Sequence, residues 1–284
     1  MVEFGVSSSI APLREVLVQT PGPAFAAAFE DSRHGFRHPV AFGVAQKEHQ
    51  ALIDLLGELD VNVHVLANDD LGPDFVYQYD PTLVTRRGAI LLRSGKPTRR
   101  GEEDALAAWY RHNEIPIIAS IEAPGTVDGG DVCWLDGENV CVGRTLRTNQ
   151  AGIDQLSALL VETVHVFDMP YDKGPDDCLH LMSVISPVSE TLALVELARL
   201  PAGLYSLCGE LGIGLIDVPP EEVDTLACNV LAVRPGVVMM LDGNPVTRQR
   251  LEDAGVEVHT FEGREICLNG NGGPTCLTRP LLRT

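Results

Sequence analysis

The feature that most constrains this sequence is a strand–helix–strand pattern that occurs five times, with a period of roughly fifty residues. Each helical stretch carries apolar residues at i, i+3 and i+4, and each flanking stretch is short and apolar. The first strands are predicted at 15–20, 89–94, 139–144, 191–197 and 237–242, the helices at 45–60, 102–113, 149–162, 204–212 and 245–255, and the second strands at 61–66, 115–120, 164–169, 213–219 and 256–261.

The uninterrupted repeat predicts one α/β domain over residues 1–284. The chain is 45% hydrophobic, which is ample for a large core, and no linker-like or low-complexity stretch divides it. A fixed period of this length is typical of arrays and closed rings. We therefore expect a ring of five pseudo-repeats around a central pocket, with the second strand of each pair packed next to its helix.

Each repeat continues into a third segment that carries one polar or reactive side chain at a similar place. These segments are 75–84, 127–135, 178–186, 226–233 and 273–282, and the side chains are Asp80, Asp128, His180, Asn229 and Cys276. Their separations are 48, 52, 49 and 47 residues, close to the period of the repeat. If the five units surround an axis, these side chains converge on one central pocket.

Composition excludes several classes of partner. The net charge is −19 and the chain has no block of five basic residues, so nucleic acid and anionic membranes are poor partners, whereas a small cationic substrate suits the field. The seven cysteines form neither CxxC nor zinc-finger spacing, which predicts reduced thiols. With no signal-peptide pattern and no membrane-length apolar run, we expect a soluble, cytoplasmic protein, and the sequence leaves a homo-oligomer open.

The five converging side chains indicate a particular chemistry. Cys276 facing His180 suggests a thiolate nucleophile with a general acid and base. Two carboxylates nearby, Asp80 and Asp128, raise the pKa of a thiol unless a cation is also present. A guanidinium is the natural cation, since it is planar and pairs with carboxylates in bidentate fashion. We expect Cys276 to attack a guanidinium carbon.

Six motifs in order, FVYQYDP, GKPTRRGE, DGGDV, GRTLRTN, CLHLMS and GGPTCLTRP, resemble the guanidino-modifying (pentein, or amidinotransferase) superfamily. The chain looks most like the dimethylarginine dimethylaminohydrolases and the arginine deiminases, and the resemblance covers nearly its whole length. It implies a five-bladed α/β propeller, in agreement with the five repeats, and a reaction that needs neither a metal nor an organic cofactor.

The resemblance also implies the catalytic roles. Cys276 would form a covalent thiouronium intermediate, and His180 would protonate the departing amine and then activate the hydrolytic water. Asp128, at the head of DGGDV, would bind a guanidinium nitrogen and steady His180. The neighbouring Asp131 is interpreted as structural.

The binding roles follow from the same resemblance. Asp80 would hold another guanidinium nitrogen, and Arg99 and Arg147 would hold the α-carboxylate of the substrate. Phe75 is expected to wall the pocket, and Asn229 is expected to make a polar contact. The segment 21–42, rich in glycine, proline, alanine and aromatic residues, is expected to act either as a lid or as a surface loop.

Several activities stay open at this point. The length of the chain, and Met182 in place of an acidic residue after His180, favour a dimethylarginine substrate. The GGPTCLTRP ending and the Asp80–Pro81 step look more like an arginine deiminase, and Tyr79 departs from the pattern of the dimethylarginine enzymes. An amidinotransferase, a non-catalytic arginine-binding protein, and a cysteine protease or glutaminase are the further alternatives.

Overall fold

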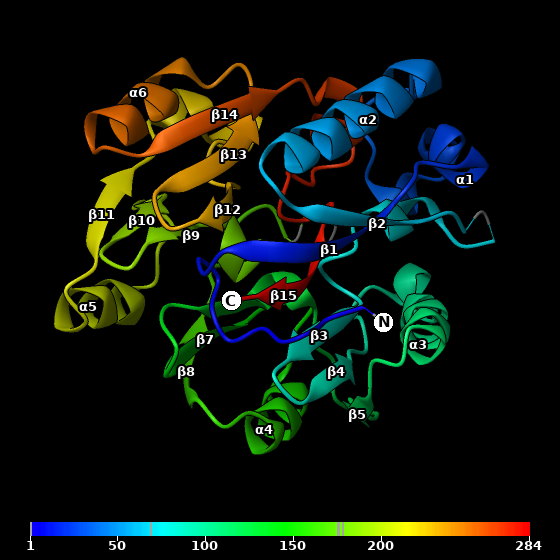
Figure 1. Cartoon of the computed structure of the whole chain (residues 1–284), viewed down its shortest axis with the longest axis horizontal. Coiled ribbons are helices and arrows are strands. Elements are labelled where there is room, and N and C mark those ends of the chain that lie inside the picture. The colour runs from blue at the N-terminus through cyan, green and yellow to red at the C-terminus, as the bar shows by residue number, and fades with distance from the viewer. Residues whose placement is uncertain (1, 69, 175–176, 178) are drawn as a thin grey trace.

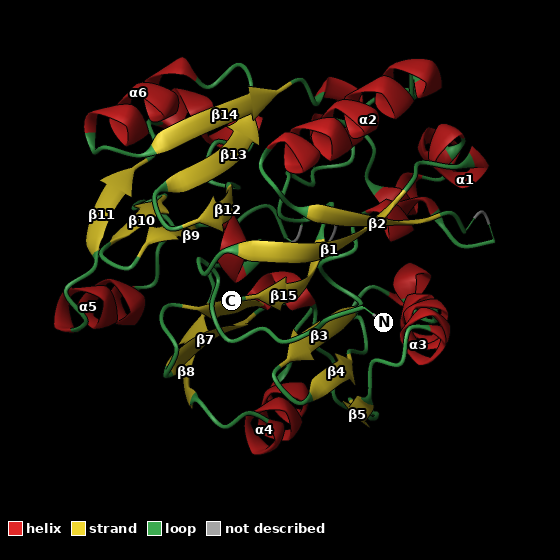
Figure 2. Cartoon of the chain, in the orientation of Figure 1, coloured by secondary structure: helices red, strands yellow, loops and turns green. Residues whose placement is uncertain are grey.

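The fold is a ring of five three-stranded sheets, seen in a computed structural model that describes residues 2–68, 70–174, 177 and 179–284. In each sheet the middle strand pairs antiparallel with an inner strand and parallel with an outer one. The middle strands are β1 (Leu13–Gln19), β4 (Gly88–Leu91), β7 (Asn139–Arg144), β10 (Leu192–Val195) and β13 (Val237–Leu241). The expected α/β fold of five repeats is confirmed (Figures 1 and 2).

The middle and outer strands of each sheet are parallel, so a helix must connect them. The helices are α2 (Phe42–Glu58), α3 (Glu102–His112), α4 (Gln150–Leu159), α5 (Ala202–Glu210) and α6 (Pro245–Asp253). The outer strands are β2 (Asn62–Leu66), β5 (Ile117–Ser120), β8 (Thr163–Asp168), β11 (Gly214–Asp217) and β14 (Glu257–Phe261). Figure 1 shows these helices at the periphery of the molecule, where each covers its own sheet.

The inner strands come from the third segments, and each belongs to the sheet of the next unit. They are β3 (Thr82–Thr85), β6 (Val132–Trp134), β9 (Ile185–Ser189), β12 (Leu231–Arg234) and β15 (Arg279–Arg283). The last of them closes the ring: β15 pairs antiparallel with β1, with Val16 opposite Pro280 and Leu17 opposite Arg279. Figure 1 shows the two strands, from opposite ends of the chain, side by side near the centre.

Burial falls from the centre of the ring to its edge. The inner strands β3, β6 and β15 are buried along their whole length, as are β4 and β13. The outer strands consist of half-buried and exposed residues, apart from the buried Phe261 at the end of β14. The loops that precede the inner strands therefore meet in the middle of the molecule. None of the helices within the described residues is long and apolar enough to cross a membrane.

The segment 21–42 is fastened to the core rather than lying free on the surface. It contains α1 (Pro23–Ala26) and two 3₁₀ turns. Phe25 and Phe36 are buried and make an edge-to-face ring contact at 5.2 Å. The backbone amides of Arg37 and His38 both donate to Oδ1 of Asn269. The lid function of this segment stays a prediction.

Candidate active site

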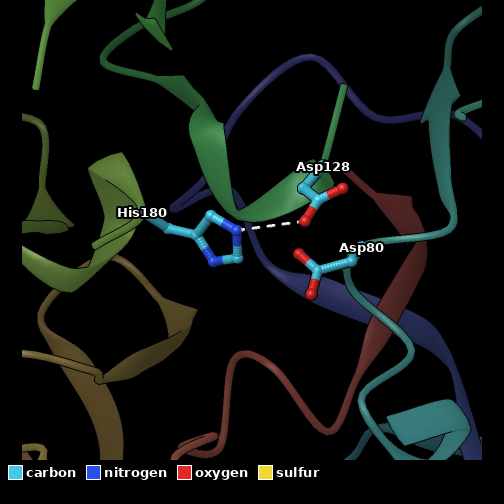
Figure 3. A group of neighbouring side chains, drawn as sticks. All are labelled: Asp80, Asp128 and His180. Atoms are coloured by element: carbon cyan, nitrogen blue, oxygen red, sulfur yellow. Dashed lines mark hydrogen bonds and ion pairs between the residues drawn. The ribbon is translucent and has the colours of Figure 1, made fainter. Parts of the chain in front are cut away.

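A central pocket of about 390 Å³ contains most of the side chains that the sequence analysis singled out. Those that line it are Asp80, Arg99, Arg147, His180, Asn229 and Cys276. Asp128 is fully buried directly behind His180. Each of the five repeat-phase residues lies in the loop just before an inner strand, and Figure 3 shows Asp80, Asp128 and His180 pointing toward one another from three such loops.

Asp128 is held as an ionised carboxylate that orients His180. Its Oδ2 lies 3.3 Å from Nε2 of His180 and 3.7 Å from Nη1 of Arg147, and its Oδ1 accepts from the backbone amide of Gly95 at 3.0 Å. Burial by itself raises the pKa of Asp128, but the hydrogen bond and charge of His180, with the charges of Arg99 and Arg147, lower it below its ordinary value. The imidazole ring is thereby fixed through one nitrogen.

Asp80 is positioned by a buried arginine. Nη1 of Arg99 donates to Oδ2 of Asp80, and the amide of Gly130 donates to Oδ1 at 2.8 Å. The other donors of Arg99 go to the carboxylate of Glu102 and to the backbone oxygens of Asp74 and Tyr77. The guanidinium is 4% exposed, so its hydrogen-bonding capacity is taken up by the protein.

The glycines of DGGD permit this close approach of three loops. A Cβ atom on Gly130 would lie 2.8 Å from Nδ1 of His180 and 3.1 Å from Oδ1 of Asp80, and one on Gly129 would lie 2.0 Å from the oxygen of Tyr79. Asp131 ties the same region together: its carboxylate accepts from both threonine hydroxyls of the GRTLRTN motif and from the amide of Leu181. The structural interpretation of Asp131 agrees with these contacts.

Cys276 faces the amide of Asn229. Nδ2 of Asn229 lies 3.2 Å from Sγ of Cys276, and its Oδ1 accepts from the amide of Thr275 at 3.1 Å. Burial and the charge of Asp80 raise the pKa of the Cys276 thiol, while the hydrogen bond from Asn229 and the charge of His180 oppose the rise. A cation bound beside the thiol would favour the thiolate further.

A cluster of three interacting side chains is among the pocket residues that the sequence analysis missed. The carboxylate of Asp74 accepts from Nζ of Lys96 at 2.9 Å and lies 2.8 Å from Nδ1 of His34. All three side chains line the pocket. Lys96 lies within the GKPTRRGE motif, and Asp74 directly precedes Phe75, the first residue of FVYQYDP. Their position in or beside these motifs could have identified Lys96 and Asp74 as pocket residues.

Phe75 lies elsewhere than expected. It is 2% exposed, packs in the hydrophobic core with Leu83 and Ile90, and lines a separate small cavity next to segment 21–42. Among the described residues, the central pocket is lined without it. The 3₁₀-helix η3 (Pro73–Val76) turns Asp74 toward the pocket and Phe75 away from it. Cys178, at the head of the third inner segment, lies outside the described residues.

The donor set also has the composition of a cation site. Ligand atoms of Asp80, Asp128 and His180 lie within 4.8 Å of one another. However, both carboxylates are already engaged by Arg99, Gly130, Gly95 and His180. Oxygens committed to buried hydrogen bonds are poorly placed to enclose a metal ion, whereas a planar cation with several N–H donors needs only the remaining lone pairs.

The chain is similar to arginine deiminases and to a dimethylarginine dimethylaminohydrolase. A family model described as arginine deiminase matches residues 69–198 and 189–283. The dimethylarginine dimethylaminohydrolase of Pseudomonas aeruginosa is 29% identical over 93% of this chain and 98% of its own length. An arginine deiminase of Listeria welshimeri is 26% identical over 74% of this chain and 62% of its own length.

A solved structure extends the first of these likenesses to the fold. A variant of the Pseudomonas aeruginosa dimethylarginine dimethylaminohydrolase, in complex with citrulline, superimposes with a TM-score of 0.79 at 25% identity. The match covers 94% of this chain and 99% of that one. The two proteins therefore share their fold over 94% of this chain.

Proposed function

We propose that this chain, which belongs to the arginine deiminase family, hydrolyses a C–N bond of a guanidino group with Cys276 as the nucleophile. The observation that carries the proposal is one pocket in which a thiol, an imidazole fixed by a buried carboxylate, and a second carboxylate converge from separate repeats. A guanidinium is the substrate group that matches this set in charge and in donor geometry.

The proposed reaction proceeds in two steps. Asp80 and Asp128 draw the guanidinium toward Cys276, and its positive charge offsets the burial that keeps the thiol protonated. The thiol proton passes to His180, the S–C bond forms, and the C–N bond to the departing amine breaks as His180 returns the proton to that nitrogen. His180 then takes a proton from water as the water oxygen bonds to the thiouronium carbon. The C–S bond breaks, His180 returns its proton to the departing sulfur, and the ureido product forms with the release of one proton to solvent.

We propose an Nω-methylated arginine as the substrate, with citrulline and, from asymmetric dimethylarginine, dimethylamine as products. Support comes from the dimethylarginine dimethylaminohydrolase of Pseudomonas aeruginosa, which matches nearly end to end, and from its solved complex with citrulline. Met182, at 6% exposure, adds no carboxylate beside His180, so a guanidinium nitrogen that carries methyl groups meets no third acid there.

Arginine itself is the second candidate, with ammonia as the leaving group. The family model and the Listeria welshimeri relative favour it, although this chain spans only 62% of that relative. Both candidates use the same residues, so the difference lies in which amine departs. An amidinotransferase would transfer the amidino group to an amine instead of water. A binding protein would hold the guanidinium with the carboxylates alone.

We also propose a reducing, cytoplasmic location, which the free thiols support. The described cysteines, which are 133, 141, 208, 228, 267 and 276, are all unpaired. Assembly into a homo-oligomer stays a prediction.

The deciding experiment is a citrulline colour assay with arginine, monomethylarginine and asymmetric dimethylarginine, on wild type and Cys276→Ser. We expect citrulline from the methylated substrates, no turnover by the variant, and retained substrate affinity by calorimetry. Cys208→Ala, a buried thiol in α5, is the matched control. Citrulline mainly from arginine would establish the deiminase, ornithine without citrulline would indicate transfer, and binding without any product would overturn the proposal.

A further inference from the structure

Two buried arginines on the closing strand β15 form no ion pair with any carboxylate that the structure describes. Arg279 is 2% exposed and Arg283 is 8% exposed. Arg99, the other buried arginine among the described residues, is paired with Asp80 and Glu102. Among the described residues, no acidic side chain lies within ion-pair distance of Arg279 or Arg283. A guanidinium stays charged when buried, and apart from the charge of Asp80, which acts on Arg279 from beyond ion-pair distance, these two charges need another form of compensation.

Backbone oxygens satisfy these guanidinium groups only in part. Arg283 donates to the oxygens of Ala11 at 2.7 Å and Ala232 at 2.8 Å. Arg279 donates from Nη2 to the oxygen of Tyr79 and lies over the ring of Tyr79 at 4.1 Å, but its buried Nε has no hydrogen-bond partner. An unpaired N–H on a buried cation is costly, and native structures rarely leave one unmatched.

Both arginines line a small cavity that is separate from the catalytic pocket. Its volume is about 20 Å³, and its other polar side chains are the hydroxyl groups of Ser8, Ser9 and Ser186, and of Thr275 and Tyr79. The Oγ of Ser8 already accepts from the amides of Ile10 and Ala11, which leaves its O–H as a donor. The described residues around the cavity include no carboxylate. Ser186 and Thr275 already donate their O–H groups to the backbone oxygens of Cys228 and Val230, so the donors that remain include those of the two arginines and of Ser8.

We propose that this cavity is a binding site for a small monovalent anion of the halide class. Two buried guanidinium groups and a free hydroxyl donor supply the charge and the hydrogen bonds that such an ion requires. A volume that holds a single water-sized particle excludes sulfate, phosphate and carboxylate ligands. Burial, and to a smaller degree the charge of Arg279, lowers the pKa of Arg283 to about 10, as expected for neighbouring cations without a counter-ion.

The cavity lies next to the loops that carry Asp80 and Asp128. Nη2 of Arg279 holds the oxygen of Tyr79, the residue before Asp80, and a Cβ atom on Gly129, the residue after Asp128, would lie 3.2 Å from the same nitrogen. A bound anion would therefore stabilise the loops that carry both carboxylates, together with the junction of β15 and β1. Its first effect should be on stability, which can be measured without any substrate.

The solution test is thermal unfolding of the wild-type protein in sodium bromide or chloride, with sodium gluconate added to hold the ionic strength constant. We expect a saturable rise in Tm with halide, on the order of 3 °C at ten times the dissociation constant. Arg279→Met should abolish the response, and Arg86→Met, which removes an exposed arginine, should retain it. Equal Tm values in halide and gluconate would overturn the proposal.

If Arg279→Met does not fold, crystals of the wild-type protein provide a second test. Wild-type crystals grown in gluconate and soaked in sodium bromide should show an anomalous peak between the guanidinium groups of Arg279 and Arg283. A water molecule at that position, with bromide only at surface sites, would overturn the proposal. Neither measurement depends on turnover, so both remain informative if the proposed hydrolysis is wrong.

Discussion

The side-chain amide of Asn229 donates to the sulfur of Cys276 over 3.2 Å, and the amide of Thr275 fixes the orientation of that donor by binding Oδ1. Two residues separated by 47 positions are thus joined by a contact that favours the thiolate over the thiol. Asn229 is 6% exposed, so water cannot readily replace it. We therefore assign Asn229 the role of positioning the nucleophile.

Asn229→Ala should therefore raise the pKa of Cys276. A hydrogen bond to a charged group contributes about 1.5–3 kcal/mol, so we expect alkylation by iodoacetamide at pH 7 to slow by at least about tenfold, with the rate–pH curve displaced to higher pH. Asn62→Ala, on the exposed edge strand β2, is the control. An unchanged rate–pH curve would show that the contact does not act on the thiol.

Gly273→Ala should reproduce this defect without touching the amide group itself. A Cβ atom on Gly273 would lie 2.5 Å from both Cγ and Oδ1 of Asn229, so the Asn229 side chain must move. We expect slower alkylation and a lower kcat, with the fold retained by circular dichroism. Gly57→Ala, a helical site with no atom within 4 Å of the added methyl group, should leave both unchanged. If iodoacetamide alkylated Gly273→Ala at the wild-type rate, the Asn229 side chain would not be fixed by its contact with Gly273.

Arg99→Lys distinguishes a positioning role from binding of the substrate carboxylate. Lysine cannot hold Asp80, Glu102 and two backbone oxygens at once, so we expect kcat/KM to fall by about a hundredfold. The loss should be equal for the substrate and for its methyl ester, which has no carboxylate charge. Arg147→Lys should affect the free acid more than the ester. A loss by Arg99→Lys that is confined to the free acid would restore the carboxylate-binding role.

The burial of His49 should make the free energy of unfolding sensitive to acid, independently of catalysis. It is 2% exposed in α2, its Nε2 has no partner, and burial lowers its pKa from 6.5 to about 4. Between these values the unfolded chain binds a proton that the folded chain does not. As far as His49 is concerned, the free energy of unfolding therefore keeps its full value above pH 6.5. It falls by about 3 kcal/mol as the pH drops toward 4.

The check is chemical denaturation of wild type and His49→Leu at pH 7.5 and pH 4.5. The free energy of unfolding should fall less in the variant than in wild type over this interval. His112→Leu, at an exposed histidine, should behave as wild type. Parallel losses in wild type and His49→Leu would show that His49 does not carry the effect.

Local patterns in the sequence were enough to predict the repeats and the five converging side chains. Strand 139–144 matches β7 residue for residue, and the helix at 149–162 covers α4, because hydrophobic periodicity and polar ends act within a few residues of each other. The phase of Asp80, Asp128, His180, Asn229 and Cys276 followed from the same period. A repeat places equivalent loops at equivalent positions in the ring, whatever the details of packing.

Tertiary structure alone decided how the ring closes and which partner each buried group takes. The pairing of β15 with β1 joins the two ends of the chain, and the offset that assigns each inner strand to the next sheet depends on long-range register. The hold of Arg99 on Asp80 and Glu102, the burial of Phe75 and the contact of Asn229 with Cys276 depend on charge neutralisation and packing among loops far apart in sequence. Spacing along the chain carries no record of such contacts, since they form only when the sheets have assembled.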